Sequence, residues 1–307
     1  MTRFSTALKS ALLVGAMAIN FPALAESVTV EHSLGTTTIE QTPQRVVVVG
    51  GHGSLDTLNR LGIEPVGAVT TMLPEYLADY SEKATHIGSM KEANFEQIFT
   101  LKPDVIIAEG RAADAYPTLS QIAPTVMHVV ENGNYWEDTK NNWRMLGKII
   151  DKEAEAEQLI EEAEAQMAEV REQVQAQGLK TLAVMNNGNN VSMFGEVSRF
   201  SVLFDEFGFE PARTSDTQNP HGNLISFEFI ADAAPDVLFV LDRESAIGQS
   251  SGKAQQLFDN PLVKSTPAYK NNRIVFLNPS AWYLTIAGVN ATEVMIDDAR
   301  KAVMSTQ

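Results

Sequence analysis

The chain has 307 residues, a formal net charge of −16 and no cysteine. Because a chain this acidic repels the phosphate backbone, we expect no nucleic-acid partner. Without cysteine it can form neither a disulfide bond nor an acylated cysteine that would tether it to a membrane. Its length suits two domains of about 100–150 residues each after removal of a short leader.

Residues 1–25 have the pattern of a secretory signal peptide. Arg3 and Lys9 precede a mostly apolar run, and Ala23-Leu24-Ala25 forms a small-x-small cleavage site. The apolar run is shorter than the roughly 20 residues that a membrane-spanning helix needs, and no later segment is a candidate. Cleavage would remove two of the 23 basic residues and none of the 39 acidic ones, leaving a net charge of −18. We therefore expect a soluble protein in the periplasm.

Residues 26–136 predict an N-terminal α/β lobe. RVVVV (45–49) is typical of a short buried strand, and it runs through the Gly-rich turn GGHGS into a helix over SLDTLNRLG and a strand in GIEPVGAV. Asn94 is a plausible N-cap of a short helix, and the strand DVIIAEG follows. Strands that alternate with helices favour parallel βαβ units with right-handed crossovers.

Residues 137–178 predict a linker region dominated by one long helix. From about Asp151 to Gln177 the chain is rich in Ala, Glu and Gln and contains neither Pro nor Gly. At 1.5 Å per residue this helix would be about 40 Å long. Its apolar residues recur at helical spacing and should pack on a lobe: Leu159, Ile160, Ala163, Met167 and Val170. Because a helix is stiff, we expect the lobes to move little relative to each other.

Residues 179–307 predict a second α/β lobe. KTLAVM (180–185) indicates a strand, NNGNNVSMFGEVS a Gly/Asn-rich loop, and RFSVLFDEFG a helix. Ser226 is then a plausible N-cap of a short helix, and the strand DVLFVLD follows. The predicted fold class is α/β, with two Rossmann-like lobes that have parallel central sheets and are joined by one long α-helix.

The two halves also repeat each other in sequence. NFEQIFTLKPDVIIAEGR (94–111) aligns without a gap on SFEFIADAAPDVLFVLDR (226–243), with seven identities. An earlier match, GIEP on GFEP, has an offset of 146 positions instead of 132. The first half therefore carries about 14 extra residues, which we assign to the stretch around MLPEYLADYSEK.

Each copy of the repeat ends in an arginine, Arg111 in the first and Arg243 in the second. Both follow a strand, and ligands of open parallel sheets bind beyond the carboxyl ends of the strands. We therefore expect the two guanidinium groups to converge on a cleft between the lobes. An ordinary surface ion pair is the alternative for either arginine, but recurrence at the same place in both halves argues against it.

The two-lobe repeat, the long helix, the leader and the Pro-Asp-strand motif together resemble a known family. Over residues 28–303 the chain is similar to the periplasmic substrate-binding proteins of iron–siderophore, haem and cobalamin ABC importers, and most of all to binders of ferric catecholate siderophores. The resemblance implies a monomer that captures such a complex in its cleft and delivers it to an ABC permease in the inner membrane. It implies no enzymatic activity and no cofactor of the protein's own, since the ligand carries the Fe³⁺.

The resemblance also implies which residues bind the ligand. Matched position by position, three cleft arginines fall on Arg111, Arg199 and Arg243, and a histidine and a tyrosine that can reach the iron fall on His221 and Tyr283. Further candidate ligand contacts are Trp282, next to the tyrosine, and His52 in the turn GGHGS, while Arg213 is a rival for the third arginine.

Glu96 and Glu228 occupy equivalent places in the two repeats, just after the expected N-caps. In the family, one glutamate on each lobe meets arginine pockets on the permease, so the resemblance implies docking through these two residues. Favourable interaction with a helix dipole, about 0.3–1 kcal/mol, is the alternative.

The chemistry of ferric catecholates agrees with this residue set. Fe³⁺ prefers six ligands, so two catecholates leave a complex of net charge about −1 with two open positions, and three leave −3 with none. Arginine presents a fixed, permanently charged fork to such an anion. A phenolate from Tyr283 and an imidazole from His221 could fill the open positions of a bis-catecholate, because coordination lowers the pKa of the phenol.

Other cargoes and another class of protein fit the sequence less well. A His/Tyr pair can also ligate haem iron, which makes haem the leading alternative. Cobalamin and hydroxamate siderophores call for less positive charge, and zinc or manganese sites need more clustered histidines and carboxylates than the five scattered histidines offer. A metal-assisted hydrolase lacks support, because the sequence has no His-Glu-x-x-His helix, nucleophile elbow or cysteine.

Overall fold

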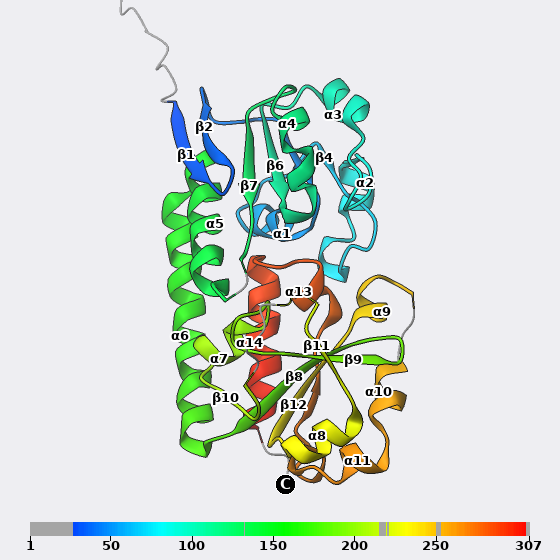
Figure 1. Ribbon diagram of the computed structural model, residues 1–307. Helices are drawn as coiled ribbons and strands as arrows, with labels where there is room; N and C mark the ends of the chain where they lie inside the picture. The colour runs from blue at the N-terminus through cyan, green and yellow to red at the C-terminus, as the bar shows by residue number, and fades with distance from the viewer. Residues whose placement is uncertain (1–26, 132, 215–218, 220, 250–252, 305–307) are drawn as a thin grey trace, which may run out of the picture.

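The computed structural model describes residues 27–131, 133–214, 219, 221–249 and 253–304. Within them the chain forms two α/β lobes stacked end to end, with a long helix running beside both (Figure 1). The prediction of two Rossmann-like lobes with a long joining helix is confirmed. The signal peptide predicted for residues 1–25 lies outside the described residues.

The N-terminal lobe contains a five-stranded parallel sheet with the order β5-β4-β3-β6-β7. Its strands are β3 (Val46–Val49), β4 (Gly67–Ala68), β5 (Thr85–His86), β6 (Val105–Glu109) and β7 (Thr125–His128). An antiparallel hairpin of β1 (Val28–His32) and β2 (Gly35–Ile39) precedes the sheet. The helical elements of this lobe are α1 (Gly53–Arg60), η1 (Glu75–Leu77), α2 (Tyr80–Lys83), α3 (Phe95–Leu101), η2 (Gly110–Ala115) and α4 (Tyr116–Leu119).

The C-terminal lobe contains a six-stranded mixed sheet. Its strands are β8 (Lys180–Asn187), β9 (Asn190–Phe194), β10 (Glu210–Pro211), β11 (Asn223–Ile225), β12 (Val237–Asp242) and β13 (Ile274–Phe276). β10, β8, β12 and β13 are parallel, whereas β9 and β11 add antiparallel pairs at one edge. Its helices are α7 (Ser201–Asp205), α8 (Phe227–Ala233), α9 (Arg243–Ala246), α10 (Lys253–Phe258), α11 (Pro261–Lys264), α12 (Pro267–Lys270), α13 (Pro279–Tyr283) and α14 (Val289–Val303).

Both central sheets are covered on two faces, which explains why their strands read as unbroken apolar runs. Along β3, Val46 and Val48 belong to one buried cluster and Val47 and Val49 to the other. The strands of the C-terminal sheet alternate in the same way between two clusters. Such double burial fixes the strand register, because a slip by one residue would exchange the two faces.

The Gly/Asn-rich stretch 186–198, which the sequence predicts to be a loop, instead contains a β-hairpin. β8 continues to Asn187, and β9 returns from Asn190 in antiparallel register with it. Gly188 has φ +60° in the connecting turn, a conformation that glycine adopts without steric cost. The helix predicted over RFSVLFDEFG is shorter than expected, since α7 covers only Ser201–Asp205.

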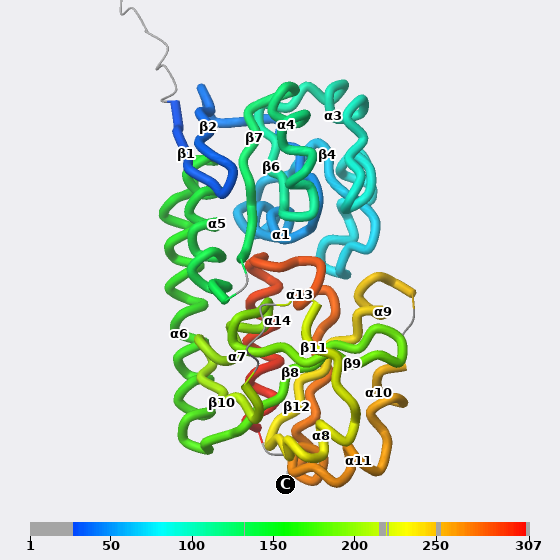
Figure 2. The backbone as a smooth tube through the Cα atoms, in the orientation of Figure 1, coloured from blue at the N-terminus to red at the C-terminus, as the bar shows by residue number. Residues whose placement is uncertain are grey.

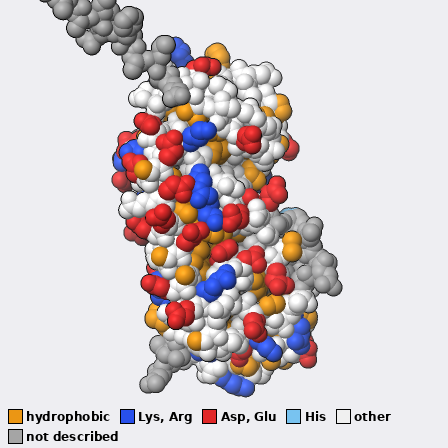
Figure 3. Space-filling view, turned by 90° about the vertical axis from the view of Figure 1, so that its left-hand side faces the viewer, with side chains coloured by type: hydrophobic (Ala, Val, Ile, Leu, Met, Phe, Trp, Pro, Cys, Tyr) orange, Lys and Arg blue, Asp and Glu red, His pale blue; other side chains and the backbone are white. Residues whose placement is uncertain are grey.

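The linker region contains two helices rather than one. α5 (Tyr135–Ile149) precedes α6 (Glu153–Gln177), and the two run side by side in Figure 1. The predicted long helix begins two residues later than expected, after Asp151 with φ +58°, and ends before Gly178 in the left-handed conformation. α6 packs on the core of the C-terminal lobe through Ile160, Ala163, Met167, Val170 and Val174, and Leu159 also packs on the N-terminal core. Its outer face is charged, and Figure 3 shows acidic and basic side chains interspersed over this side of the molecule.

The sequence repeat marks equivalent places in the two lobes. The Asp104 carboxylate accepts hydrogen bonds from the main-chain N–H groups of Gln44 and Arg45, and Asp236 accepts one from Lys180. The Pro-Asp motif thus ties the beginning of one central strand, β6 or β12, to that of its neighbour, β3 or β8. Between β4 and α3, the extra residues of the first half form η1, α2 and β5. In the second half β10 is the counterpart of β4, and the next described strand and helix are β11 and α8.

The segment 284–288 connects α13 to α14 at the boundary between the lobes. In the tube view (Figure 2) this orange-to-red part of the chain lies directly below α1 of the N-terminal lobe. The main-chain N–H of His52 donates to the carbonyl oxygen of Leu284 across this boundary.

Candidate functional site

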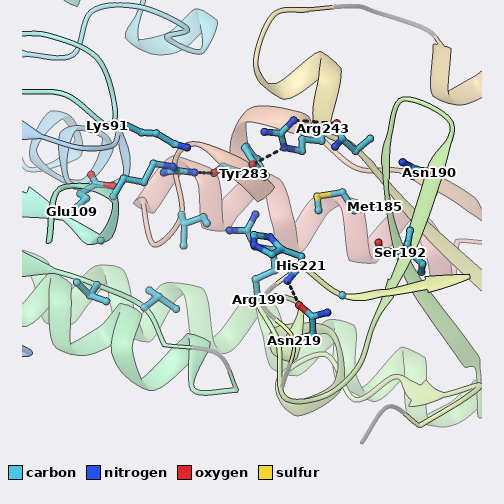
Figure 4. A pocket seen from close by; sticks show the side chains of 18 of the residues that line it. Lys91, Glu109, Met185, Asn190, Ser192, Arg199, Asn219, His221, Arg243 and Tyr283 are labelled. Carbon is cyan, nitrogen blue, oxygen red and sulfur yellow. Dashed lines mark hydrogen bonds between the residues drawn. The ribbon is translucent and has the colours of Figure 1, made fainter. Parts of the chain in front are cut away.

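A cavity of about 790 Å³ lies between the two lobes (Figure 4). The N-terminal half contributes Lys91, Glu109, Gly110, Arg111, His128, Val129 and Val130 to its lining. The C-terminal half contributes Met185, Asn187, Asn190, Ser192, Arg199, Asn219, His221, Gly222, Leu224, Arg243, Tyr283 and Ile286. Five of the residues expected to bind the ligand are thus brought together: the three arginines, the histidine and the tyrosine.

Arg111 and Arg243 occupy equivalent positions at the carboxyl ends of two central strands. Arg111 lies in η2, which begins directly after β6, and Arg243 begins α9 directly after β12. Asp242 at the end of β12 accepts a hydrogen bond from the main-chain N–H of Ser245 and so fixes the first turn after the strand. The repeat therefore places one guanidinium group on each side of the cavity, as the sequence predicted.

Tyr283 lies at the centre of the three arginines. The Cζ atoms of Arg111, Arg199 and Arg243 are 5.6, 4.9 and 5.8 Å from the centre of its ring. Arg243 Nε donates to the phenolic oxygen at 3.0 Å, and Arg111 Nη2 donates to the main-chain carbonyl oxygen at 2.8 Å. Figure 4 shows Tyr283 between Arg243 and Arg199. A cation close to an aromatic ring is attracted by its quadrupole, so the contacts with Tyr283 offset part of the repulsion among the three guanidinium groups.

The positive charge of this cluster is not neutralised by ion pairs. Among the described residues, none of the three guanidinium groups takes part in a salt bridge. Burial lowers the pKa of Arg199, and the charges of Arg111 and Arg243 lower it further. Three cations beside one cavity repel one another, and a negative charge between them would relieve this repulsion.

His221 and Lys91 are two further nitrogen-bearing groups at the cavity. His221 is exposed and its main-chain N–H donates to the side chain of Asn219. In Figure 4 its ring lies on the same side of the cavity as Arg199. Lys91 enters from the N-terminal lobe and forms no salt bridge within the described residues. No sequence pattern points to Lys91, because it lies outside every predicted strand, helix and motif.

Glu109 and His128 line the N-terminal wall of the cavity and were not predicted. They are paired neighbours at the ends of β6 and β7. Burial raises the pKa of Glu109 to about 7, against the opposing influence of two hydrogen bonds from Ser54 and of the charge on Arg111. Burial lowers the pKa of His128 to about 4, and its Nε2 has no hydrogen-bond partner in the described part of the chain. Neither residue carries a local motif, because only strand pairing brings them together.

Two predicted ligand contacts, His52 and Trp282, do not reach the cavity. His52 is fully buried, and its Nε2 is bonded to the carbonyl oxygen of Val69 at 3.0 Å. Trp282 is 3 % exposed and donates from Nε1 to Asp298 in the C-terminal core. The turn that carries His52 is itself buried, whereas Trp282 lies on the face of α13 that packs on the C-terminal core and its neighbour Tyr283 faces the cavity. Arg213 is also elsewhere, since it pairs with Asp232 on the surface.

Glu96 and Glu228 are both exposed residues in the first turn of a helix. The predicted N-caps are confirmed, because Asn94 accepts a hydrogen bond from Gln97 N and Ser226 accepts one from Phe229 N. Hydrogen bonds with its own main chain and with Ser226 lower the pKa of the Glu228 carboxyl. α3 and α8 lie far apart, at opposite ends of the two-lobed molecule (Figure 1).

The described residues contain no cluster of three or more His, Cys, Asp or Glu side chains arranged to hold a metal ion. None of the helices in the described part of the chain is long and apolar enough to cross a membrane.

Comparison with known proteins identifies the family. The profile of the periplasmic binding protein family matches residues 47–281. The petrobactin-binding protein YclQ of Bacillus subtilis is 34% identical over 280 residues, which cover 90% of this chain and 88% of YclQ. The ferric-anguibactin-binding protein FatB of Vibrio anguillarum is 33% identical over 285 residues, covering 91% and 88% of the two chains. The chain therefore belongs to the periplasmic binding protein family, whose members bind substrates rather than transform them.

Solved structures agree with this assignment. The crystal structure of the periplasmic catecholate-siderophore binding protein VctP from Vibrio cholerae has a TM-score of 0.86 and 43% sequence identity, and covers 90% of this chain and 99% of VctP. The structure of the siderophore-binding protein BauB, bound to a complex between two molecules of acinetobactin and ferric iron, has a TM-score of 0.85 and 32% identity, and covers 92% and 100% of the two chains.

Proposed function

We propose that this protein captures an anionic ferric catecholate siderophore in the cavity between its lobes and delivers it to an ABC permease in the inner membrane. The observation that carries the proposal is the cluster of three guanidinium groups around Tyr283, none of which forms a salt bridge within the described residues. Its relatives support the same cargo class, since VctP is a catecholate-siderophore binder and YclQ and FatB bind petrobactin and ferric anguibactin. The protein acts by binding and release, without catalysis and without a cofactor of its own.

The arginines bind the ligand by charge. A ferric bis-catecholate carries about one negative charge and a tris-catecholate about three, distributed over catecholate oxygens that accept hydrogen bonds. Arg111 and Arg243 approach these oxygens from opposite lobes, and the half-buried Arg199 provides a third charge. Hydrogen bonds between charged partners contribute about 1.5–3 kcal/mol each, so three of them support tight binding.

His221 and Tyr283 are the residues that would complete the coordination of a bis-catecholate iron. Both line the same cavity, and the Tyr283 phenolic oxygen accepts a hydrogen bond from Arg243. A tris-catecholate fills all six positions of the iron and needs the arginines alone. The proposal therefore covers both kinds of ligand with one residue set.

The proposed function also includes export of the protein to the periplasm and its docking on the permease. Residues 1–25 would direct the chain to the periplasm as a signal peptide, and a monomer would present Glu96 and Glu228 to the two halves of the permease. Their exposure on separate lobes supports docking at two points.

A fluorescence titration tests the cargo class. Trp136, Trp143 and Trp282, which all belong to the core cluster of the linker helices and the C-terminal lobe, supply the signal. The titrants are iron-loaded bis-catechol, tris-catechol and hydroxamate ligands and haem. We expect strong quenching at low concentration with the two catecholates only. Tight binding of haem or of the hydroxamate in their place would overturn the proposal.

Absorption spectra test the iron ligands separately. With the bis-catecholate, Tyr283→Phe should shift the charge-transfer band relative to the unaltered protein, because one phenolate oxygen leaves the iron. With the tris-catecholate the spectrum should stay unchanged. An unchanged band in both complexes would remove Tyr283 from the coordination sphere while leaving the cargo class intact.

A further inference from the structure

The C-terminal helix α14 is capped by a residue of the other lobe. Its own N-cap, Gly288, has no side chain with which to accept a hydrogen bond. The carboxylate of Asp56, in α1 of the N-terminal lobe, accepts from the main-chain N–H of Asn290 at 3.0 Å and from that of Ala291 at 2.9 Å. These are the second and third residues of α14, the N–H groups that an N-cap side chain normally satisfies.

The Asp56 side chain is fully buried at this contact. It accepts two further hydrogen bonds, from Asn290 Nδ2 at 2.6 Å and from Tyr76 OH at 2.9 Å. A Cβ atom at Gly288 would lie 2.3 Å from Asp56 Oδ2, although the φ of −79° at Gly288 suits any residue. Glycine is therefore required here by the approach of the carboxylate and not by the backbone conformation.

The segment just before α14 forms part of the cavity wall. Residues 284–288 follow Tyr283, and Ile286 lines the cavity beside it. The N-terminal lobe and α5 hold this segment at several points: Trp143 Nε1 donates to the carbonyl oxygen of Ala287 at 2.7 Å, and Thr57 Oγ1 donates to the same oxygen at 3.4 Å. Ala287 has φ +61°, a strained conformation for a residue with a side chain, so surrounding contacts must hold the segment in place.

We propose that Asp56 is a positioning residue that fixes Tyr283 among the three arginines by capping α14 across the boundary between the lobes. The cap fixes the end of the segment 284–288 at Asn290, and η2 fixes its beginning through the hydrogen bond from Arg111 to the carbonyl oxygen of Tyr283. Because the N-terminal lobe holds both ends of this segment, Tyr283 of the C-terminal lobe keeps one position in the cavity. This inference rests on the proposed function, in which Tyr283 binds the iron of a bis-catecholate.

Amide hydrogen exchange tests the cap without any ligand. In Asp56→Ala, exchange at the amides of Asn290 and Ala291 should accelerate at least about tenfold, and residues 284–288 should follow. The matched control is Asp104→Ala, which removes a carboxylate that also accepts two main-chain hydrogen bonds, but within one lobe. It should leave exchange in 284–291 unchanged. Equal acceleration in both variants would mean that Asp56 contributes only general stability, and would overturn the inference.

Binding tests the consequence for the site. Asp56→Ala should raise the Kd for ferric bis-catecholate about tenfold and shift its charge-transfer band, while the Kd for the tris-catecholate, which needs no tyrosine, should change less than about threefold. Asp56→Asn keeps one of the two acceptor oxygens and replaces the other by an amide NH2, so it should restore part of the affinity and of the band. Unchanged bis-catecholate affinity and spectrum in Asp56→Ala would overturn the inference. If the unaltered protein bound no catecholate, the proposed function would fail, while the exchange experiment would still decide whether the cap exists.

Discussion

Replacing Arg199 by Met should have opposite effects on ligand binding and on the stability of the ligand-free protein. Arg199 is half-buried, burial lowers its pKa, and it has no salt-bridge partner among the described residues. Methionine retains much of the aliphatic volume but removes the charge. The variant therefore separates the electrostatic contribution of this residue from its packing.

The expected change in the stability of the ligand-free Arg199→Met variant follows from the distances between the guanidinium groups and Tyr283. Because the guanidinium carbons lie within 5.8 Å of one ring centre, no two of them can be more than about 11 Å apart. At about 10 Å and an effective dielectric constant of about 20, two unit charges repel by about 1.7 kcal/mol. Removing one of three charges deletes two such terms, and the loss of the cation–π contact offsets about 1–2 kcal/mol of this gain. We expect the ligand-free variant to be more stable by about 1.5–2.5 kcal/mol.

Arg199→Met should also weaken the binding of a ferric catecholate. At about 5 Å and the same dielectric constant, one positive and one negative unit charge attract by about 3 kcal/mol, which is about two orders of magnitude in Kd. The loss should be larger for a tris-catecholate than for a bis-catecholate, because the ligand charge is larger. Isothermal titration calorimetry measures the Kd, and a thermal melt measures the stability. Arg213→Met is the control, since Arg213 pairs with Asp232 away from the cavity. A lower Tm together with unchanged affinity in Arg199→Met would refute the reasoning.

The buried titratable groups and the docking residues give the remaining predictions. Because His128 has a folded-state pKa of about 4, it binds fewer protons when folded than unfolded between pH 4 and 6.5, and stability is lost as the pH falls through this window. His128→Gln should thus gain up to about 3 kcal/mol relative to the parent as the pH falls from 6.5 to 4. Glu109, with a folded-state pKa of about 7, has the opposite sign, so Glu109→Gln should gain relative to the parent as the pH rises from 4.5 to 7. Denaturant unfolding across this range checks both, and curves parallel to the parent would contradict them. Glu96→Ala and Glu228→Ala should each reduce ferric-siderophore uptake by cells without changing the Kd of the purified protein, and normal uptake in the double variant at normal protein levels would exclude docking through them.

Those parts of the fold that depend on local pattern or on internal repetition could be predicted from the sequence. The central strands were recognisable because both of their faces are buried, and the caps at Asn94 and Ser226 because the capping residue stands next to its helix. Arg111 and Arg243 could be placed at the cavity because a strand end has a defined position in a parallel sheet. Repetition then supplied an independent check, since two equivalent arginines must lie at equivalent places.

What depends on contacts between distant residues could not be predicted. Glu109 and His128 meet only through the pairing of β6 with β7. The cap from Asp56 to α14 joins residues 234 positions apart, and nothing near either residue indicates it. His52 was placed at the cavity because its turn is Gly-rich, yet composition does not reveal that the ring turns inward to bond Val69. The 186–198 hairpin was missed because glycine and asparagine suit a tight turn as well as a loop.

The most direct test of the account compares two ferric complexes that have similar iron geometry but different net charge. The measurement is the Kd, by calorimetry, of two ferric complexes of similar size, an iron tris-catecholate of charge −3 and a neutral iron tris-hydroxamate. If unpaired guanidinium groups around Tyr283 capture the ligand, the tris-catecholate should bind at least about a hundredfold more tightly, and added salt should narrow the difference. Equal affinities for the two complexes, or a preference for the neutral one, would contradict the account.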